Sequence, residues 1–473
     1  MSTKYLPKFI FLFFLTLVQS NATEVDVLLD CSSCGTLTTQ NVSGTYALTS
    51  DTVIADKNLT IAGDLNLNGY TLTVSCGSVI VSGNFNGGGT LIIAGDLTVT
   101  GATQNNPTIN SNQCYETWVG GTSTDWGNDN NWKNGVPTSS MDVTIPNGLS
   151  NKPIIGATTG ASVNNLTINE VDGLTVLGGG SLILSGNLDG SGLITYTRTL
   201  SNSWHLIAAP GIGETYNDTW VSNNGIDTNG TGNNVAIAPY NTSDDTWDYM
   251  QSGGGGSFVL GKGYAIKRAN AGNVSFTVDI NAGAITTATL NRVGNGFNLL
   301  GNPYMSYMNS KTLLDDSNSI LRQQTIWIWN HTTSSYNTWV ANDQFKIAPA
   351  QGFFVQAKSS AQFNFTEANQ SHQSDTFQRP VTASPEIYLT LTDDSNTRYT
   401  RINYNEGTTT GFDNGYDGTM FGASSNAFAI YTHLVGNEQG ELGNSQGHGY
   451  AVQSLPTDNY ENMIVPVGIN ATR

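Results

Sequence analysis

Between residues 53 and 101 the sequence is divided into short runs that alternate apolar and polar side chains, such as NLTI at 58–61, TLTV at 71–74 and SVIV at 78–81. A period of two is typical of β-strands with one buried face. Gly and Asn separate the runs, and both residues tolerate the positive φ angles of tight corners. Because such short strands cannot bury an apolar face alone, the pattern requires that successive runs stack on one another.

Longer phrases in this region also recur, which is typical of repeat architectures in which each unit stacks on the next. We therefore predict β-solenoid-like segments over residues 24–110 and about 140–198. A meandering β-sandwich is the alternative. Two phrases each occur twice: residues 61–69 (IAGDLNLNG) return as 93–101 (IAGDLTVTG), and 78–87 (SVIVSGNFNG) return as 181–190 (SLILSGNLDG).

Three tryptophans, Trp118, Trp126 and Trp132, lie between the two solenoid-like segments. They could form a platform on which sugar rings stack, because an indole offers a large apolar face and a polar N–H. They could equally form the cap that covers the open end of a solenoid. We favour the cap and assign residues 111–198 to a Trp-rich cap followed by the second solenoid-like segment.

A larger repeat follows, with WHLIAAP at 204–210 matching FNLLGNP at 297–303, and GYAIK at 263–267 matching GFFVQ at 352–356. We predict two similar β-sandwich, jelly-roll-like units over residues 199–280 and 290–370. In that case Trp204 and Phe297 occupy equivalent buried positions, and so do Gly263 and Gly352. Helix is nearly absent from the pattern, and residues 310–316 are expected to form one short helical turn.

The C-terminal part contains a polar linker at 371–384 and then further alternating runs from residue 385 onward. The pattern at 463–471 is that of a strand with no partner after it, so we expect residues 385–473 to be an incomplete C-terminal β module. The predicted fold class is all-β, with a β-solenoid-like N-terminal region followed by repeated β-sandwich modules.

Composition excludes several classes of protein. Only 11% of the residues are charged, and Asp plus Glu (36) outnumber Lys plus Arg (18), giving a net charge of −18. Helical bundles and coiled coils use far more charged helix-forming residues. An acidic surface repels the phosphate backbone, so nucleic acid is not an expected partner.

The N-terminus has the layout of a signal peptide. Lys4 and Lys8 precede an apolar run at 9–18, and small residues follow up to Ala22. The run is shorter than the ~20 residues that a membrane-spanning helix needs, and no later run is long enough. We predict that residues 1–22 are removed and that the protein is secreted or displayed on the cell surface. A retained signal anchor is the alternative.

All the cysteines lie in the first quarter of the chain, so any disulfides would cross-link only the N-terminal module. An exported protein can keep disulfides, which makes these residues disulfide candidates. Free thiols are one alternative, and a zinc site that uses the C-x₂-C pair is another. The four residues are Cys31, Cys34, Cys76 and Cys114.

Several phrases together resemble large secreted surface proteins of the Bacteroidetes, flavobacteria especially. They are WHLI at 204–207, GNPY at 301–304, QGFFV at 351–355, GFDNGYD at 411–417 and the Trp order of residues 118–137. The resemblance implies export by the general secretory route and then by the type IX secretion machinery. In that class a C-terminal sorting domain directs export, and this sequence departs from the pattern because it lacks that domain. It therefore resembles a fragment whose sorting signal lies on a missing part.

No catalytic constellation is evident. None of the five histidines lies beside a G-x-S-x-G elbow, no H-E-x-x-H motif occurs, and the carboxylates cannot be paired from sequence as a glycosidase requires. The sequence favours a protein without enzymatic activity and without a cofactor. Structural calcium is possible at two oxygen-rich segments, for which solvated turns are the alternative reading. The candidate ligands are Asp227, Asn229, Asn233, Asp413 and Asp417.

These features lead to one functional prediction and one rival. The prediction is a non-catalytic structural or adhesive protein on the outside of a Gram-negative bacterium, with surface polysaccharide as a possible partner. The rival is an exported module that binds or degrades polysaccharide. A strip of exposed aromatic residues beside paired carboxylates would favour the rival, whereas aromatic residues buried in sandwich cores would favour the prediction.

Overall fold

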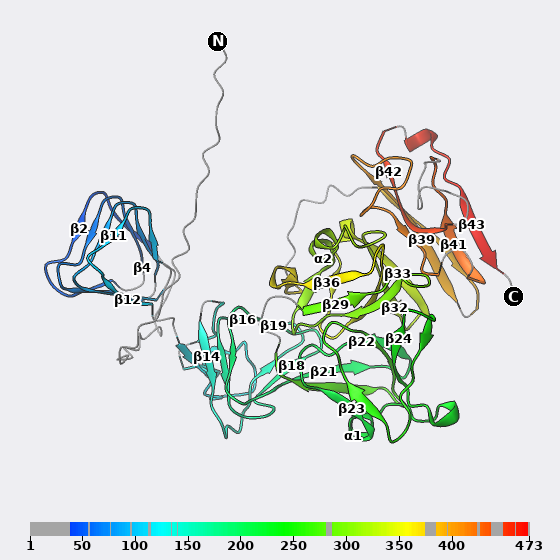
Figure 1. The fold of residues 1–473 in the computed structure, drawn as a ribbon, viewed down its shortest axis with the longest axis horizontal. Coiled ribbons are helices and arrows are strands. Elements are labelled where there is room, and N and C mark those ends of the chain that lie inside the picture. Colours follow the sequence, from blue (N-terminus) through cyan, green and yellow to red (C-terminus); the bar gives the residue numbers. More distant parts are fainter. Residues whose placement is uncertain are drawn as a thin grey trace, which may run out of the picture.

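The computed structural model describes residues 38–471 apart from 55–56, 76, 95–96, 112–114, 134, 140, 281–285, 374–384, 395, 423–425, 437–447 and 459. The predicted signal peptide, the four cysteines and most of the predicted linker lie outside the described residues. Strands make up 47% of the structure and helices 7%, which confirms the all-β prediction. Figure 1 shows the order of the modules along the chain, from a blue solenoid to an orange and red C-terminal sheet.

The first solenoid coils through three parallel four-stranded sheets. Its apolar positions, among them Leu59, Leu72 and Val79, point inward and are fully buried. The sheets are β1 (Thr38–Val42), β4 (Lys57–Ile61), β7 (Val79–Val81) and β10 (Leu97–Val99); β2 (Tyr46–Ala47), β5 (Leu65–Asn66), β8 (Phe85–Asn86) and β11 (Thr103–Gln104); and β3 (Thr52–Ile54), β6 (Thr71–Val74), β9 (Thr90–Ile93) and β12 (Thr108–Ser111).

The length of one turn differs from the spacing of the repeated phrases. Leu59 pairs with Val79, and Val79 pairs with Leu97, so the chain completes one turn between each of these residues and the next. The phrases at 61–69 and 93–101 are farther apart than one turn but closer than two, and they begin at the ends of β4 and β9, which belong to different sheets. The two phrases lie on different sides of the coil, so they do not stack on one another. They are alike because each leads from one sheet to the next.

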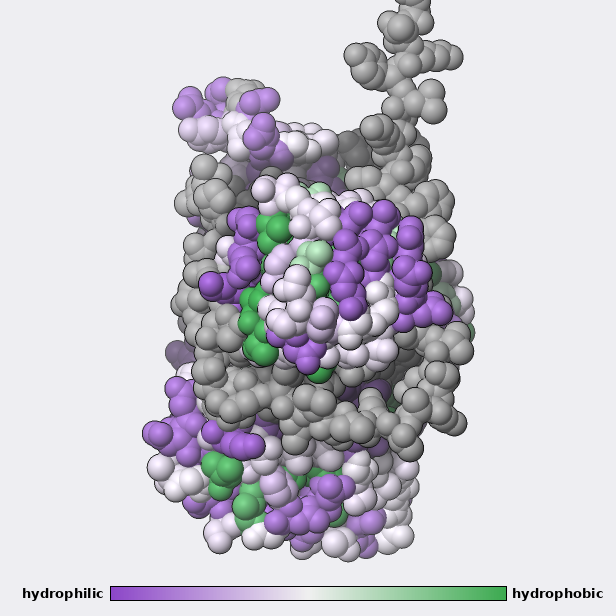
Figure 2. Space-filling model, turned by 90° about the vertical axis from the view of Figure 1, so that its left-hand side faces the viewer, coloured by the Kyte–Doolittle hydropathy of each residue, from purple (hydrophilic) through white to green (hydrophobic). Residues whose placement is uncertain are grey.

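The second solenoid continues the same architecture, and the two segments together contain about seven turns. Its first sheet contains β13 (Tyr115–Thr117), β14 (Asp142–Ile145), β17 (Leu166–Ile168) and β20 (Leu188–Asp189). The others contain β15 (Ile154–Ile155), β18 (Leu174–Leu177) and β21 (Ile194–Leu200), and β16 (Gly160–Val163) with β19 (Ser181–Leu184). Figure 2 faces the side of the molecule on which the first solenoid lies in Figure 1, and its coloured residues are mainly hydrophilic or neutral, with apolar residues in small separate groups.

The last strand of the second solenoid belongs also to the next module. β21 pairs along its whole length with the antiparallel strand β28 (Gly272–Val278), which closes the first repeat. One continuous core accordingly runs from Trp118 in the cap to Phe276 in that repeat. The solenoid and the repeat share a sheet and a core, so no flexible linker separates them.

The two repeats have the same sequence of elements and the same sheet order, which confirms the predicted repeat of β-sheet modules. One sheet of the first repeat has the order β22–β27–β24–β25, and that of the second is β30–β35–β32–β33. Trp204 and Phe297 open β22 and β30. The strands correspond as β22 (Trp204–Ile207) with β30 (Phe297–Gly301), β27 (Tyr264–Lys267) with β35 (Gly352–Gln356), β24 (Ile237–Asn241) with β32 (Thr325–Asn330), and β25 (Thr246–Trp247) with β33 (Ser335–Val340).

The correspondence extends to the remaining elements. In each repeat a short helix follows a short strand, which is β23 (Thr215–Asn217) in the first repeat and β31 (Tyr307–Asn309) in the second. The side chain of Asn217 or Asn309 accepts a backbone N–H at the start of the helix. The helix expected at 310–316 is therefore present, and its counterpart in the first repeat was missed by the sequence pattern. The other equivalent elements are β23 (Thr215–Asn217) with β31 (Tyr307–Asn309), α1 (Asp218–Asn223) with α2 (Ser310–Asp316), β26 (Gly255–Ser257) with β34 (Lys346–Ile347), and β28 with β36 (Ala361–Phe365).

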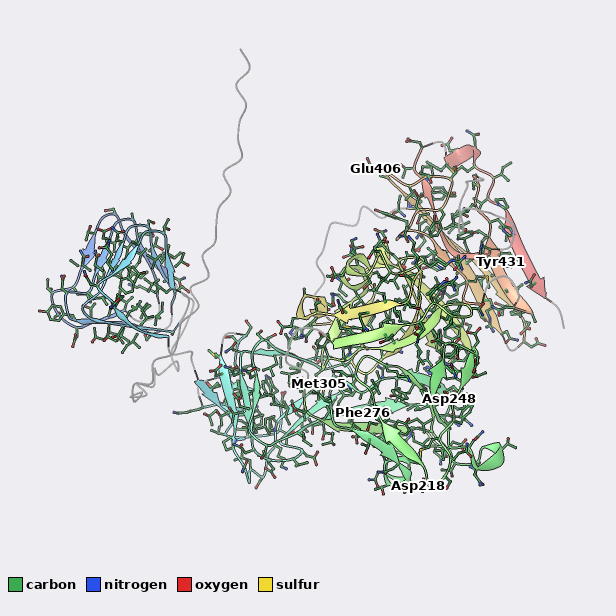
Figure 3. All side chains as sticks on the ribbon, in the orientation of Figure 1. Asp218, Asp248, Phe276, Met305, Glu406 and Tyr431 are labelled. Carbon is green, nitrogen blue, oxygen red and sulfur yellow. The ribbon has the colours of Figure 1, made fainter. Side chains whose placement is uncertain are left out.

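The second repeat also contacts the second solenoid. The Leu182 N–H donates to the Met305 carbonyl at 2.9 Å, and the Tyr196 hydroxyl donates to the Pro349 carbonyl at 3.1 Å. Met305, labelled in Figure 3, lies where the solenoid meets the repeats. The second repeat is therefore held against the solenoid by direct contacts.

The C-terminal module is one sheet of order β38–β39–β42–β41–β43, with β40 paired to β42. Arg401 in this sheet makes two bonds, of 2.6 and 2.7 Å, to the Asp343 carboxylate of the second repeat. These contacts fasten the sheet to that repeat. The strands are β38 (Glu386–Thr392), β39 (Thr397–Asn405), β40 (Gly418–Thr419), β41 (Phe428–Thr432), β42 (Tyr450–Pro456) and β43 (Val467–Ala471).

Candidate functional site

The two repeats meet through a pseudo-two-fold interface. Ile207 bridges to Gln351, and the equivalent pair, Leu300 and Lys262, makes the reciprocal bridge. The Ala208 N–H donates to Ala350 and the Gly301 N–H to Gly261, both at 3.0 Å. Such reciprocity is the mark of an isologous interface, formed here between two halves of one chain.

Gly301 lies at the centre of this contact. A Cβ at that position would come within 2.1 Å of the Ala208 Cβ, so only glycine lets the two backbones approach this closely. The GNP phrase that identified the repeat in the sequence thus has a packing role.

Alternation along the strands directs one face of each sheet to its own core and the other to the interface. In β22, Ile207 belongs to the core of the first repeat, whereas Leu206 belongs to a cluster that also contains Phe354 and Trp327 of the second. The aromatic side chains of both repeats therefore gather between the sheets. The half-buried members of this cluster are Trp204, Tyr240, Trp247, Trp329, Tyr336 and Phe421.

Phe421, from the C-terminal module, covers the end of the second sheet. Its ring centroid lies 3.9 Å from Tyr336, 4.5 Å from Phe297 and 4.9 Å from Phe354. We call this position the filled socket. The Trp327 Nε1–H donates at 2.9 Å to the carbonyl of Thr419, which shortly precedes Phe421, so the segment that carries Phe421 is held in register.

The equivalent end of the first sheet is open. There a cavity of about 240 Å³, which we call the open socket, is lined chiefly by aromatic rings. The sequence predicts a buried Trp204, but the side chain is only half-buried because no described residue covers it as Phe421 covers Phe297. The rings that line the open socket are Trp204, Trp247, Tyr249, Trp329 and Tyr336.

His205 lines the same cavity and packs against His331, with ring centroids 4.5 Å apart and the ring planes tilted by 42°. Its Nε2 lies 3.0 Å from the Ser201 hydroxyl. Burial lowers the pKa of His205 to about 4, and the neighbouring His331 and Arg198 add to this shift. The imidazole is therefore neutral at physiological pH, so the cavity wall carries a polar group without charge.

Other cavities also adjoin the repeats, among them two of similar volume. One of about 560 Å³ lies between the second repeat and the C-terminal sheet, beside Arg398 and Phe428. Another, of about 550 Å³, is lined by residues of both repeats, among them Asp248, Lys262 and Asn298. Both have more polar linings than the open socket, which has the most aromatic wall of the three.

The three tryptophans of the cap are buried, with at most 4% of their surface exposed. Trp132 makes edge contacts with both other rings, at centroid distances of 4.9 and 4.6 Å. The Trp118 Nε1–H donates to the Asn151 carbonyl at 2.7 Å. The buried rings offer no face on which a sugar could stack, and their place at the start of the second solenoid supports the cap interpretation.

The calcium candidates of the first repeat lie in a hydrogen-bonded turn. Asp227 forms an ion pair of 2.9 Å with Lys267, and its other oxygen accepts the backbone and side-chain N–H groups of Asn229. Asn233 has a positive φ of 67°. Every carboxylate oxygen here has a donor, and the described residues contain no cluster of three or more His, Cys, Asp or Glu suited to a metal. Calcium at this turn stays a prediction.

The second pair of candidates organises a loop. Asp417 is fully buried, and its two oxygens accept the N–H groups of Asp413 and Ser454, both at 2.6 Å. Asp413 in turn accepts from Thr409. The same loop contacts the second repeat, where the Gln324 N–H donates to Asn414 at 2.8 Å. Asp413 and Asp417 therefore shape the loop that precedes Phe421.

The buried carboxyl of Asp417 predicts a pH-dependent stability. Burial is the main cause that raises the pKa of Asp417 to about 8; the nearby Asp413 carboxylate also contributes, and the two N–H donors oppose the shift. Because the unfolded value is about 3.9, the folded state binds this proton more tightly. Stability from this group is therefore complete below about pH 4, falls as the pH rises and levels off above about pH 8.

We expect thermal unfolding at pH 5 to 8.5 to show this trend. The Asp417→Asn variant, which cannot ionise at this position, should have a flatter dependence of Tm on pH than the wild type. Differential scanning fluorimetry of both proteins in matched buffers measures the two slopes. Equal slopes would show that Asp417 is ionised in the folded protein across this range.

Sequence reasoning missed the role of His372, which it placed in the linker. Its ring lies against the second solenoid, with Nε2 2.8 Å from the Ser162 hydroxyl and Nδ1 2.6 Å from the Ser181 hydroxyl. The histidine thereby joins the end of the second repeat to two neighbouring turns of the solenoid. The sequence offered no local signal, because the two serines belong to a different module, far from His372 along the chain.

The fold and the open socket define an all-β repeat protein with an aromatic cavity between two paired modules. Residues 117–207, which span the cap, the second solenoid and the first strand of the first repeat, match a family described as a domain of unknown function, DUF8693. No curated protein and no solved structure matches the chain. None of the described helices is long and apolar enough to cross a membrane.

Proposed function

We propose that the chain is a non-catalytic structural or adhesive protein, exported through the type IX secretion machinery to the outside of a Gram-negative bacterium. The observation that carries the proposal is the way the modules are joined. The second solenoid shares a sheet with the first repeat through β21 and β28, and the repeats share the pseudo-two-fold interface. A stiff series of modules suits a protein that holds a binding surface away from the cell.

The C-terminal sheet extends this series. Its contacts with the second repeat include the Arg401–Asp343 ion pair and the bond from Trp327 to the Thr419 carbonyl. Arg401 and Asp343 are both about nine-tenths buried, and removing one partner of a buried pair is costly. The module therefore keeps a defined position next to the repeats.

The experiment locates the protein in its native host. We expect mass spectrometry of the isolated protein to find an N-terminus at Thr23, and we expect protease treatment of intact cells to digest the protein. A strain that lacks the gene should adhere less well to surfaces than its complemented counterpart. An intact leader together with protection from external protease would overturn the proposal.

A second candidate function is polysaccharide binding or degradation by an exported module. The half-buried Trp204 and Trp247 at the open socket favour it, because solvent-accessible indoles are typical of surfaces that contact ligands. Purified protein incubated with neutral polysaccharides tests the degrading activity. Release of reducing ends would establish hydrolysis. An unchanged substrate would exclude degradation of that polysaccharide and leave binding as the remaining form of this function.

A further inference from the structure

The open socket and the filled socket occupy equivalent positions in two equivalent sheets. Trp204 corresponds to Phe297, Trp247 to Tyr336 and Ala265 to Phe354, as the aligned strands require. In the second repeat this position receives a ring, that of Phe421. The fold has therefore produced a ring-binding position twice, and in the first repeat it remains accessible.

The walls of the two sockets differ in chemistry. The filled socket surrounds the phenyl ring of Phe421 with Phe297, Phe354 and Tyr336, and of these three only Tyr336 carries a polar group. The open socket presents Trp204, Trp247 and Tyr249 from the first repeat, together with Trp329 and Tyr336 from the second. Indole and phenol rings combine an apolar face with an N–H or O–H donor, so they suit a ligand that is apolar on one side and hydrated on the other. A sugar ring has this character, whereas a phenyl ring does not.

Two side chains show how the open socket is adapted. Ala265 stands where the second repeat has Phe354, which leaves room beside Trp329. Tyr249 stands where the second repeat has Thr338, and its ring makes an edge contact with Trp204 at 5.9 Å. Because Tyr stands in place of Thr, the open socket has an additional aromatic wall. The open socket therefore differs from the filled socket in its lining as well as in lacking an occupant.

The volume of the open socket and the net charge of the chain limit the class of ligand that the socket can bind. The cavity of about 240 Å³ is smaller than the ~300–1,000 Å³ of sites for drug-sized molecules, so it takes one ring at a time. The chain carries a net charge of −18, which repels acidic ligands. The nearest imidazole, His205, is neutral at physiological pH because of its lowered pKa.

We propose that the open socket binds a single six-membered ring of a neutral polysaccharide, with the ring face against Trp204 and Trp247. The hydroxyls of the sugar would then meet the polar edge formed by Tyr249 and His205. The proposal deepens the adhesive role proposed above and rests on it for the source of the sugar. The socket itself is defined by geometry alone.

Affinity electrophoresis of the purified full chain tests the proposal. Separate gels contain galactomannan, xylan or mixed-linkage β-glucan as neutral polysaccharides, and alginate as an acidic one. We expect at least one neutral polysaccharide to retard the protein and alginate to leave its mobility unchanged. The Trp247→Ala variant should bind at least tenfold more weakly. Tyr249→Thr, which restores the side chain of the second repeat, should weaken binding several-fold without leaving a buried cavity.

Trp339→Ala is the matched control. This indole is also half-buried, but it stacks on Phe345 at 4.5 Å and lies outside the open socket. It should keep the affinity of the wild type. Circular dichroism of each variant confirms that the β structure is retained, so weakened binding by both Trp247→Ala and Tyr249→Thr, with unchanged binding by Trp339→Ala, would support the proposal.

Three results would overturn the inference. The first is a wild-type protein that no neutral polysaccharide retards, and the second is equal binding by the wild type and Tyr249→Thr. The third is a concentration-dependent dimer in light scattering that Trp247→Ala abolishes, which would assign the socket to a side chain of a second copy. These results are distinct from a failure of the proposed function. A surface-exposed protein that binds no glycan would contradict only the proposal for the open socket. A glycan-binding protein that is retained inside the cell would contradict only the proposed surface role.

Discussion

Replacing Trp327 with alanine is expected to destabilise the second repeat by about 3–5 kcal/mol, the usual cost of deleting a large buried aromatic side chain. Trp327 is fully buried, and its ring lies 5.2 Å from Phe297 and 6.0 Å from Phe421. The change also removes the donor to the Thr419 carbonyl, and an unpaired buried carbonyl adds a further penalty. The loss therefore reaches both the repeat interface and the C-terminal module.

Urea denaturation followed by tryptophan fluorescence measures the first effect, and hydrogen exchange in peptides covering residues 411–421 measures the second. Trp327→Phe keeps most of the ring and loses the N–H, so it should cost about 1–3 kcal/mol. Tyr70→Ala on the first solenoid, where the side chain is 38% exposed, should be nearly neutral. An unchanged urea midpoint for Trp327→Ala would show that the ring is not part of this core.

Replacing Trp118 with alanine is expected to open the second solenoid from its first turn, at a cost of about 3–5 kcal/mol. The ring is fully buried against Trp132, and its N–H satisfies the Asn151 carbonyl. Terminal repeats need a cap because their outer face would otherwise be exposed. Exposed strand edges pair readily with other chains, so we also expect the variant to self-associate.

Val119→Ala is the neighbouring control, because Val119 is 44% exposed and contributes little to the cap. Size-exclusion chromatography with light scattering measures association, and urea unfolding measures stability. If Trp118→Ala stays monomeric and unfolds with the wild type, the cap does not close the solenoid. That result would also reopen the alternative of a sugar-stacking platform.

Local patterns in the sequence were enough to predict the strands and the relation between the repeats. Alternation with a period of two depends only on which face of a strand is buried, so runs such as 58–61 could be recognised without knowing their neighbours. Equivalence of the repeats follows from the matched phrases at 204–210 and 297–303, since similar local sequences form similar local structures. The short helix at 310–316 was predicted from the same kind of local pattern.

The length of a solenoid turn could not be obtained this way. The phrases at 61–69 and 93–101 are alike because both form a corner, and every corner has the same need for Gly or Asn. The actual length of a turn, from Leu59 to Val79 and from Val79 to Leu97, depends on the perimeter of the coil, which is set by how the enclosed side chains fill it. A corner motif carries no information about that perimeter.

The candidate site depends on contacts between distant residues. Trp204 and Phe297 stand at equivalent positions, and sequence alone predicted that both are buried. Phe421, which comes from the C-terminal module, covers Phe297 and not Trp204, so one position became core and the other became the wall of a cavity. The sequence by itself determined the strands, the repeats and their alternating faces, because these follow from local sterics and burial. The tertiary structure decided which aromatic face stays accessible, because that depends on which distant segment packs over it.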